Sequence, residues 1–178
     1  ELGAQRHIVP ATPKIVGGAL VVPAGWFQAD PHATTPATHS VDALARSRIE
    51  QLAMDAVAAA ERAMGNQPRD VSADKCGWDI TSAVPSTGNT LPDDRLIEVK
   101  GRAKGATTIT LTKNEIIAAL NKPDQFWLAI VLVNEDDSTE GPYYLQGPVS
   151  QAPDWAEVSK NLELAELLAR ATRQGGGV

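Results

Sequence analysis

The stretch from Phe126 to Val133, FWLAIVLV, constrains the fold more than any other part of the sequence. It is an unbroken apolar run, far shorter than the roughly 18 to 20 residues that a membrane helix needs. Runs of this length that lack polar alternation and contain aromatic and β-branched residues are typical of a strand buried on both faces. The run therefore predicts a strand that other elements cover on both sides.

Patterns elsewhere predict the elements around this strand. Helical spacing of apolar residues predicts a long helix from Val41 to Met64, with Ser40 or Asp42 as its cap and Gly65 as its stop. Sequence patterns predict two further helices, a short one capped by Thr112 at 113–120 and a closing one at 161–172. Alternation of apolar and polar residues between turn residues predicts strands at 69–72, 77–81, 95–101, 107–111 and 143–145. A turn containing Gly88 and Asn89 predicts that strands 77–81 and 95–101 form a hairpin. The predicted fold class is α/β.

Three segments are expected along the chain. Residues 1–40 contain five prolines and form an N-terminal arm and linker, in which Ile15 to Pro23 is a short strand or ordered arm. His32 and His39 are expected to be loop residues, because no acid or cysteine cluster accompanies them. Residues 41–150 form the core domain, and residues 151–178 form a C-terminal helix and tail.

Composition excludes several classes of protein. The chain of 178 residues contains a single cysteine, Cys76, which cannot form an internal disulfide or a cysteine zinc site. Together with the lack of a signal peptide or membrane segment, this favours a cytoplasmic protein. The formal net charge of −6 argues against a broad basic surface, so any contact with nucleic acid must use a local patch or metal ions.

The stretch Leu96 to Gly101, LIEVKG, introduces the candidate chemistry. Side chains alternate between the two faces of a strand, so that Ile97 and Val99 enter the core while Glu98 and Lys100 emerge together on the other side. In the predicted hairpin, Asp79 lies nearly opposite Glu98 on the neighbouring strand.

Strand parity supports the same placement of Asp79. Trp78 and Ile80 are expected on the buried face, which leaves Asp79 on the outer face with Glu98 and Lys100. Two adjacent carboxylates repel each other unless a cation lies between them, and oxygen-only ligands favour Mg²⁺ or Mn²⁺. Such a metal would polarise a phosphodiester, while Lys100 orients the attacking water or meets the phosphate charge. The alternative is a solvated hairpin face with a charge ladder that contributes little energy.

The order of elements resembles a known nuclease superfamily. The predicted order is a helix, three strands, a second helix and a strand, which is an αβββαβ core. This order resembles the PD-(D/E)xK nucleases, whose restriction-endonuclease-like core is a mixed sheet flanked by helices. Within that superfamily, residues 41–133 are similar to the NO VEIN C-terminal domain family; the segments that carry the likeness are 70–72 (DVS), 77–80 (GWDI), 97–102 (IEVKGR) and 111–115 (LTKNE). A proline before Asp79, found in some relatives, is replaced here by Trp78.

The resemblance implies a Mg²⁺-dependent endonuclease domain that acts on DNA, with Asp79 and Glu98 as metal ligands and Lys100 assisting the attacking water. It also implies an acid from the first helix, which helical phase leaves open between Glu50 and Glu61. Further candidates for substrate binding are Arg102 and Lys104, which follow the LIEVKG strand, and Asn114 and Glu115, which begin the second helix. The alternatives are an ordinary charged loop for the first pair and, for Glu115, a capping box with Thr112.

The outer segments suggest a larger context. Ile15 to Pro23 and Asn161 to Arg170 are similar to the C-terminal end of bacterial Swi/Snf-type helicases, in which such a domain follows the motor. The resemblance therefore implies a helicase motor in the full-length chain and a role in DNA processing or defence. The sequence itself contains no GxxxxGK[ST] phosphate loop. Two other hypotheses are a catalytically silent module that binds DNA or docks a motor on the same fold, and a purely structural domain.

Overall fold

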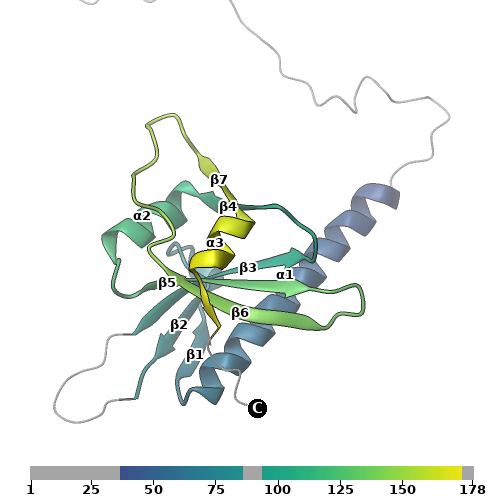
Figure 1. Cartoon of the computed structure of the whole chain (residues 1–178), viewed down its shortest axis with the longest axis horizontal. Helices are drawn as coiled ribbons and strands as arrows, with labels where there is room; N and C mark the ends of the chain where they lie inside the picture. The colour runs from purple at the N-terminus through teal and green to yellow at the C-terminus, as the bar shows by residue number, and fades with distance from the viewer. Residues whose placement is uncertain (1–36, 86–93, 174–178) are drawn as a thin grey trace, which may run out of the picture. The chain divides into compact units, whose positions relative to one another are not determined.

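A six-stranded mixed sheet forms the centre of the structure (Figure 1). The computed structural model describes residues 37–85 and 94–173. The strands lie in the order β1 (Gln67–Asp70), β2 (Ile80–Ala83), β3 (Arg95–Ala103), β5 (Phe126–Val133), β6 (Thr139–Gln146) and β8 (Thr172–Arg173). Only β3 and β5 are parallel, and the other neighbours are antiparallel. The predicted mixed sheet flanked by helices is confirmed, and it is compatible with a restriction-endonuclease-like fold.

Strand β5 is the inner strand that the apolar run predicts. It pairs with β3 on one side and with β6 on the other, and its bounds are those expected. Leu128 and Ile130 belong to the core on one face of the sheet, whereas Ala129 and Val131 belong to the core on the opposite face. All four are fully buried. The strand is therefore covered on both faces, which confirms the prediction.

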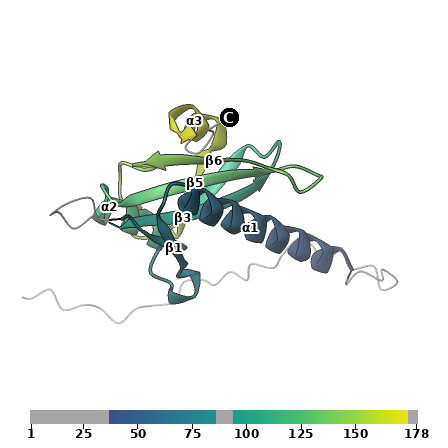
Figure 2. The same cartoon turned by 90° about the horizontal axis from the view of Figure 1, so that it is seen from below.

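Helices cover the two faces of the sheet. On one face, α1 (Ala37–Ala63) packs Ala53 and Val57 against the sheet residues of the first core cluster. On the other face, α2 (Lys113–Asn121) and α3 (Leu164–Arg170) contribute Ile116 and Leu164 to the second cluster. Figure 2 shows α1 and α3 on opposite sides of the sheet. Within the described ranges, no helix has the combination of length and apolar character that crossing a membrane requires.

A glycine sets the distance between α1 and β3. A Cβ atom placed on Gly101 would lie 2.8 Å from the carbonyl oxygen of Ile49 and 2.9 Å from the Cβ of Ala53. The helix backbone therefore rests directly on the strand, which a side chain at this position would prevent. This contact fixes the middle of α1 beside the LIEVKG segment.

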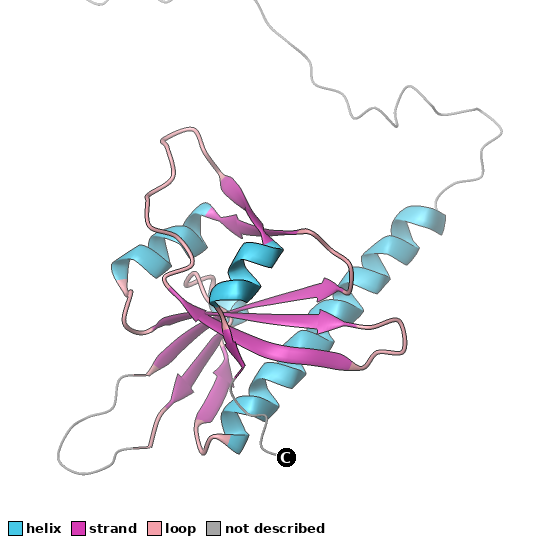
Figure 3. Cartoon of the chain, viewed as in Figure 1, coloured by secondary structure: helices cyan, strands magenta, loops and turns pink. Residues whose placement is uncertain are grey.

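The C-terminal segment differs from its prediction. The expected helix 161–172 is divided into strand β7 (Ser159–Glu163), the short helix α3 and strand β8. Strand β7 pairs with β4 (Thr108–Thr112) in a separate two-stranded sheet, which Figure 3 shows apart from the main sheet. Leu162 pairs with Ile109 there, and the Thr110 hydroxyl donates to Asn161 Oδ1 at 2.7 Å. These long-range partners favour a strand over the helical pattern. Strand β6 is also longer than expected, and it pairs with β8.

The bounds on the N-terminal side also differ. Helix α1 begins at Ala37, ahead of the predicted caps, and β1 and β2 are displaced from the expected ranges. The 3₁₀ helix η3 (Ser72–Asp74) and positive φ angles at Lys75 (52°) and Gly77 (97°) keep the segment before β2 out of the sheet. The predicted antiparallel pairing of β2 with β3 is present, although its turn at Gly88 and Asn89, like Ile15 to Pro23 and His32, lies outside the described residues.

Candidate functional site

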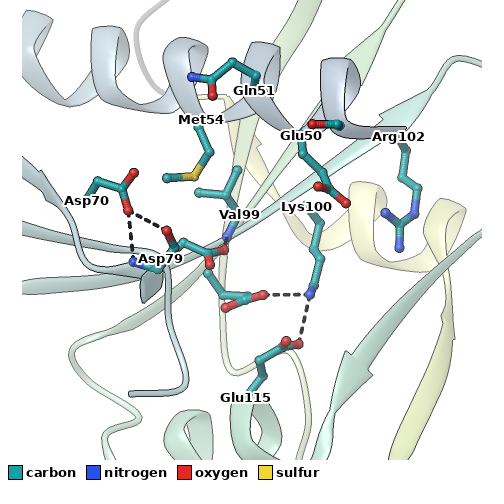
Figure 4. Close-up of a pocket in the computed structure, with 12 residues that line it drawn as sticks. Glu50, Gln51, Met54, Asp70, Asp79, Val99, Lys100, Arg102 and Glu115 are labelled. Carbon is teal, nitrogen blue, oxygen red and sulfur yellow. Dashed lines mark hydrogen bonds and ion pairs between the residues drawn. The ribbon is translucent and has the colours of Figure 1, made fainter. Parts of the chain in front are cut away.

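A cleft of 490 Å³ opens where α1, β3, the segment around β1 and the start of α2 meet (Figure 4). Five of its lining residues are acids and two are cations: Glu50, Asp70, Asp79, Glu98, Glu115, Lys100 and Arg102. The cleft lies where the pairing of β2 with β3 ends at Ile80 and Ile97. Strand β3 continues past that point, so its polar side chains can face the cleft.

Asp79 lies directly before the first residue of β2, and three hydrogen bonds hold it there. Its backbone N–H donates to the carbonyl of Ile97 at 3.0 Å, and its own carbonyl accepts from Val71 at 2.8 Å. Its carboxylate oxygen Oδ2 accepts the N–H of Val99 at 3.0 Å, in place of the missing strand neighbour. Burial raises the pKa of Asp79; the bond from Val99 and the charge of Lys100 oppose that shift, and nearby carboxylates add to it.

Glu98 is buried rather than exposed on an outer face. Its side chain lies on the face of the sheet that does not carry α1, as strand parity predicts, but only 3% of the residue is exposed. The alternative interpretation, a solvated hairpin face with a charge ladder, is therefore wrong, because this part of the strand forms a wall of the cleft. Burial raises the pKa of Glu98 to about 8, with Lys100 opposing the shift and the Asp79 charge adding to it.

Lys100 bridges two carboxylates. Its Nζ lies 2.6 Å from Glu98 Oε1 and 2.9 Å from Glu115 Oε2, and Figure 4 shows the Lys100 side chain extending toward Glu115. Burial acts to lower the pKa of Lys100, but the two carboxylates outweigh burial and the net shift is upward. The structure thus brings together Asp79, Glu98 and Lys100, the three residues that the strand pattern places on one face.

The structure separates the two candidate acids of the first helix. Glu50 lines the cleft. Glu61 does not: it is fully buried, forms an ion pair of 3.2 Å with Arg95 and accepts a hydrogen bond of 2.8 Å from Asn66. The expectation that Glu61 faces the site is wrong. Eleven residues are close to three full turns, so both acids share a helical phase but lie about 16 Å apart along the axis.

The predicted substrate-binding residues are also divided. Arg102 lines the cleft, and its guanidinium donates to the carbonyls of Gly101 at 2.8 Å and Thr108 at 3.2 Å. Lys104 lies outside the cleft, because its ammonium forms an ion pair with Glu140 on β6. The structure therefore separates Lys104 from the residues that line the cleft.

Glu115 forms the capping box that the alternative predicts, and it also lies at the cleft. In the capping box it accepts the N–H of Thr112 at 3.0 Å through Oε2. Asn114 lines two neighbouring cavities instead of the main cleft.

Asp70 is a site residue that the sequence reasoning did not assign. It ends β1 and lines the cleft, and its Oδ1 accepts hydrogen bonds from the N–H of Ser72 at 2.9 Å and from the Ser72 hydroxyl at 2.7 Å. These two bonds lower the pKa of Asp70 and keep it ionised. The Asp-x-Ser spacing of an Asx turn was the available signal. The cleft therefore has an additional carboxylate beside Asp79.

The donor chemistry of the cleft fits a hard divalent cation. In residues 37–85 and 94–173, no group of three or more histidine, cysteine or acidic side chains is close enough to hold a metal as it stands. However, Asp79 and Glu98 are oxygen donors, the Asp79 charge raises the pKa of Glu98, and a cation between the two carboxylates would relieve that repulsion. The Lys100 ammonium now balances the charge of Glu98.

Comparison with known proteins gives one match. No curated protein and no solved structure matches the chain. A family model described as "Protein NO VEIN, C-terminal" matches residues 49–145, more than half of the chain. The matched region begins on α1 beside Glu50, ends on β6, and includes every acid of the cleft. The chain therefore belongs to the Protein NO VEIN C-terminal family.

Proposed function

We propose that this domain is a metal-dependent endonuclease that hydrolyses DNA phosphodiester bonds in the cleft. The observation that carries the proposal is the buried Glu98 and the half-buried Asp79, with the Lys100 ammonium 2.6 Å from Glu98, all open to one cleft. Buried carboxylates next to a cation, in a cleft, are a typical arrangement of catalytic groups.

Six charged residues of the cleft have a role in this proposal. Asp79 and Glu98 hold Mg²⁺ or Mn²⁺, and Glu50 and Asp70 are further oxygen donors that line the same cleft. The bound cation supplies a polarised phosphate oxygen and a more acidic water. Lys100 orients the attacking water and holds positive charge beside the phosphate, and Arg102 contacts the phosphate backbone.

Attachment to a helicase motor belongs to the same proposal. Its support is the likeness of Ile15 to Pro23 and Asn161 to Arg170 to the end of Swi/Snf-type helicases. On this basis the domain would cut DNA that a linked motor delivers, in DNA processing or defence.

A plasmid-cutting assay with Mg²⁺ or Mn²⁺ tests the nuclease function. The test variant is Lys100→Ala and its matched control is Lys104→Ala, which removes a lysine from the segment after β3, outside the cleft. We expect Lys100→Ala to slow cutting by about 100-fold or more, the usual effect of losing a group that assists proton transfer. Lys104→Ala should cut at the normal rate. Equal cutting by the two variants would contradict the proposal.

A catalytically silent DNA-binding or motor-docking module is the second candidate. One observation favours it: the Lys100 ammonium lies 2.6 Å from Glu98 and 2.9 Å from Glu115, and so supplies the positive charge that a metal would bring. Calorimetric titration with Mn²⁺ separates the two candidates. A nuclease should bind Mn²⁺ and lose that binding in Asp79→Asn and Glu98→Gln, whereas a silent module should bind DNA without binding Mn²⁺ at these residues.

A further inference from the structure

A second cavity, of 350 Å³, lies next to the catalytic cleft against α2. Lys75, Trp78, Asn114 and Lys122 are among its lining residues. A smaller cavity of 210 Å³ connects the two, because its lining includes Asp79, Glu98 and Glu115 from the cleft and Lys75, Trp78 and Asn114 from the second cavity. The three cavities therefore adjoin one another, in a series that leads away from the carboxylates.

The floor of this path is held in place by close packing. Gly77 has a φ angle of +97°, and a Cβ atom there would lie 2.9 Å from the Cβ of Ala118 and 3.0 Å from the carbonyl oxygen of Asn114. The segment that carries Lys75 and Trp78 thus rests directly on α2. The indole N–H of Trp78 donates to the Thr81 hydroxyl at 3.0 Å. The aromatic ring is therefore fixed in position before any ligand arrives.

The second cavity differs in charge from the catalytic cleft. The cleft contains five acids, whereas the lining of the second cavity contains two lysines and no acid. Lys122 Nζ lies 5.5 Å from the centre of the Trp78 ring, and within the described part of the chain neither lysine forms an ion pair with a carboxylate. Both lysines are exposed. Two ammonium groups, an indole and an amide offer contacts for a phosphate, an aromatic base and a base edge.

We propose that the second cavity binds one unpaired nucleotide of the strand whose neighbouring phosphodiester lies in the cleft. This inference rests on the proposed nuclease function and narrows its substrate to DNA that is single-stranded or splayed open at this position. A volume of 350 Å³ lies at the lower end of the range of small-molecule sites, roughly 300 to 1,000 Å³, and suits one nucleotide. A base that remains stacked and paired in a duplex cannot present its face to a ring on the protein. Lys75 and Lys122 contact the phosphate, Trp78 contacts the base, and Asn114 contacts the base edge.

Binding to a labelled oligodeoxynucleotide of about ten nucleotides tests the inference, since sites for single strands cover roughly 4 to 16 nucleotides. Fluorescence anisotropy is measured on the whole chain with Ca²⁺ in place of Mg²⁺, for the single strand and for its duplex. We expect the single strand to bind more tightly and to quench tryptophan fluorescence.

Three variants locate the site. Trp78→Leu should weaken single-strand binding about tenfold, in line with the usual effect of losing one stacking partner, and Trp78→Phe should restore most of the affinity. The double variant Lys75→Asn/Lys122→Gln removes only exposed side chains, and Asn tolerates the positive φ at residue 75. It should weaken binding and reduce its salt dependence, whereas the control Lys104→Gln should not.

The outcomes separate this inference from the nuclease proposal. Unchanged affinity in the double lysine variant, or tighter binding of the duplex, overturns the nucleotide site even if Lys100→Ala abolishes cutting. Weaker single-strand binding in the double lysine variant, together with unchanged cutting by Lys100→Ala, supports the nucleotide site and rejects the catalytic role of Lys100.

Discussion

Replacing Gly101 with alanine should disturb the acid-lined cleft through the helix that forms part of it. The new Cβ would lie 2.8 Å from the Ile49 carbonyl oxygen, 2.9 Å from the Ala53 Cβ and 3.0 Å from the Ile49 Cγ2. Ordinary contacts between carbon atoms are about 3.5 to 4.0 Å, so α1 must retreat from β3 by roughly 0.5 to 1 Å. Gly101 does not have a positive φ angle, so the cost is steric. Overpacking of this kind costs about 1 to 3 kcal/mol of unfolding free energy.

The same displacement of the helix should also change the site. Glu50 follows Ile49 on α1, and so the retreat of the helix moves this carboxylate away from Glu98 and Lys100. A displacement of about 1 Å at a catalytic centre can cost on the order of 100-fold in rate. Urea unfolding measures the stability, and Mn²⁺ titration with plasmid cutting measures the site.

A second glycine provides the control for this experiment. Gly105 has a φ angle of +93° and no atom within 4 Å of its Cβ position. Gly105→Ala should therefore lose about 1 to 2 kcal/mol through backbone strain alone. It should retain Mn²⁺ affinity and cutting. If Gly101→Ala unfolds at the same urea concentration as the native chain and binds Mn²⁺ equally well, the reasoning about helix position is refuted.

Three further predictions concern the stability of the fold. Glu61→Ala leaves the Arg95 guanidinium without its buried partner and should lower the free energy of unfolding in urea by about 3 to 5 kcal/mol. The control Glu50→Ala, at an exposed position, should change that free energy by no more than about 0.5 kcal/mol. Similar losses in the two variants would contradict the assignment of Glu61 to a buried ion pair. The pKa of Glu98 in the folded state is raised from 4.5 to about 8, so between these pH values the folded state keeps a proton that the unfolded state releases. The free energy of unfolding should therefore fall as the pH rises through this range. The fall should be smaller in Glu98→Gln, and an identical pH profile of the two proteins would refute this prediction. Gly77→Ala combines a positive φ with a contact of 2.9 Å and should lower the thermal midpoint more than Gly105→Ala does.

The central strands β3 and β5 were predictable from the sequence because their signals are local. The apolar run from Phe126 to Val133 defines β5 without reference to any other segment. The alternation in LIEVKG, with the parity of Asp79, is enough to bring three polar side chains to one cleft. Side-chain period in a strand is fixed by the backbone, so these inferences need only the correct strand and its partner.

Other features depended on partners that are distant in the sequence. Glu50 and Glu61 have the same helical phase, and only the position of α1 along the sheet, set by Gly101, separates them. The burial of Glu98 depends on the elements that cover its side of the sheet, and strand β7 depends on its pairing with β4. None of these can be inferred from the period of a single segment.

A single oxygen atom links the cleft to the second helix. Oε2 of Glu115 accepts the N–H of Thr112 at 3.0 Å and lies 2.9 Å from the Lys100 ammonium. Any ligand that draws Lys100 toward itself leaves this oxygen with only the helix cap, which changes the charge felt by the first turn of α2. The rate of amide hydrogen exchange in that turn should therefore change when a ligand occupies the cleft. Comparing this rate with and without ligand would detect binding without a label on the protein or on the ligand.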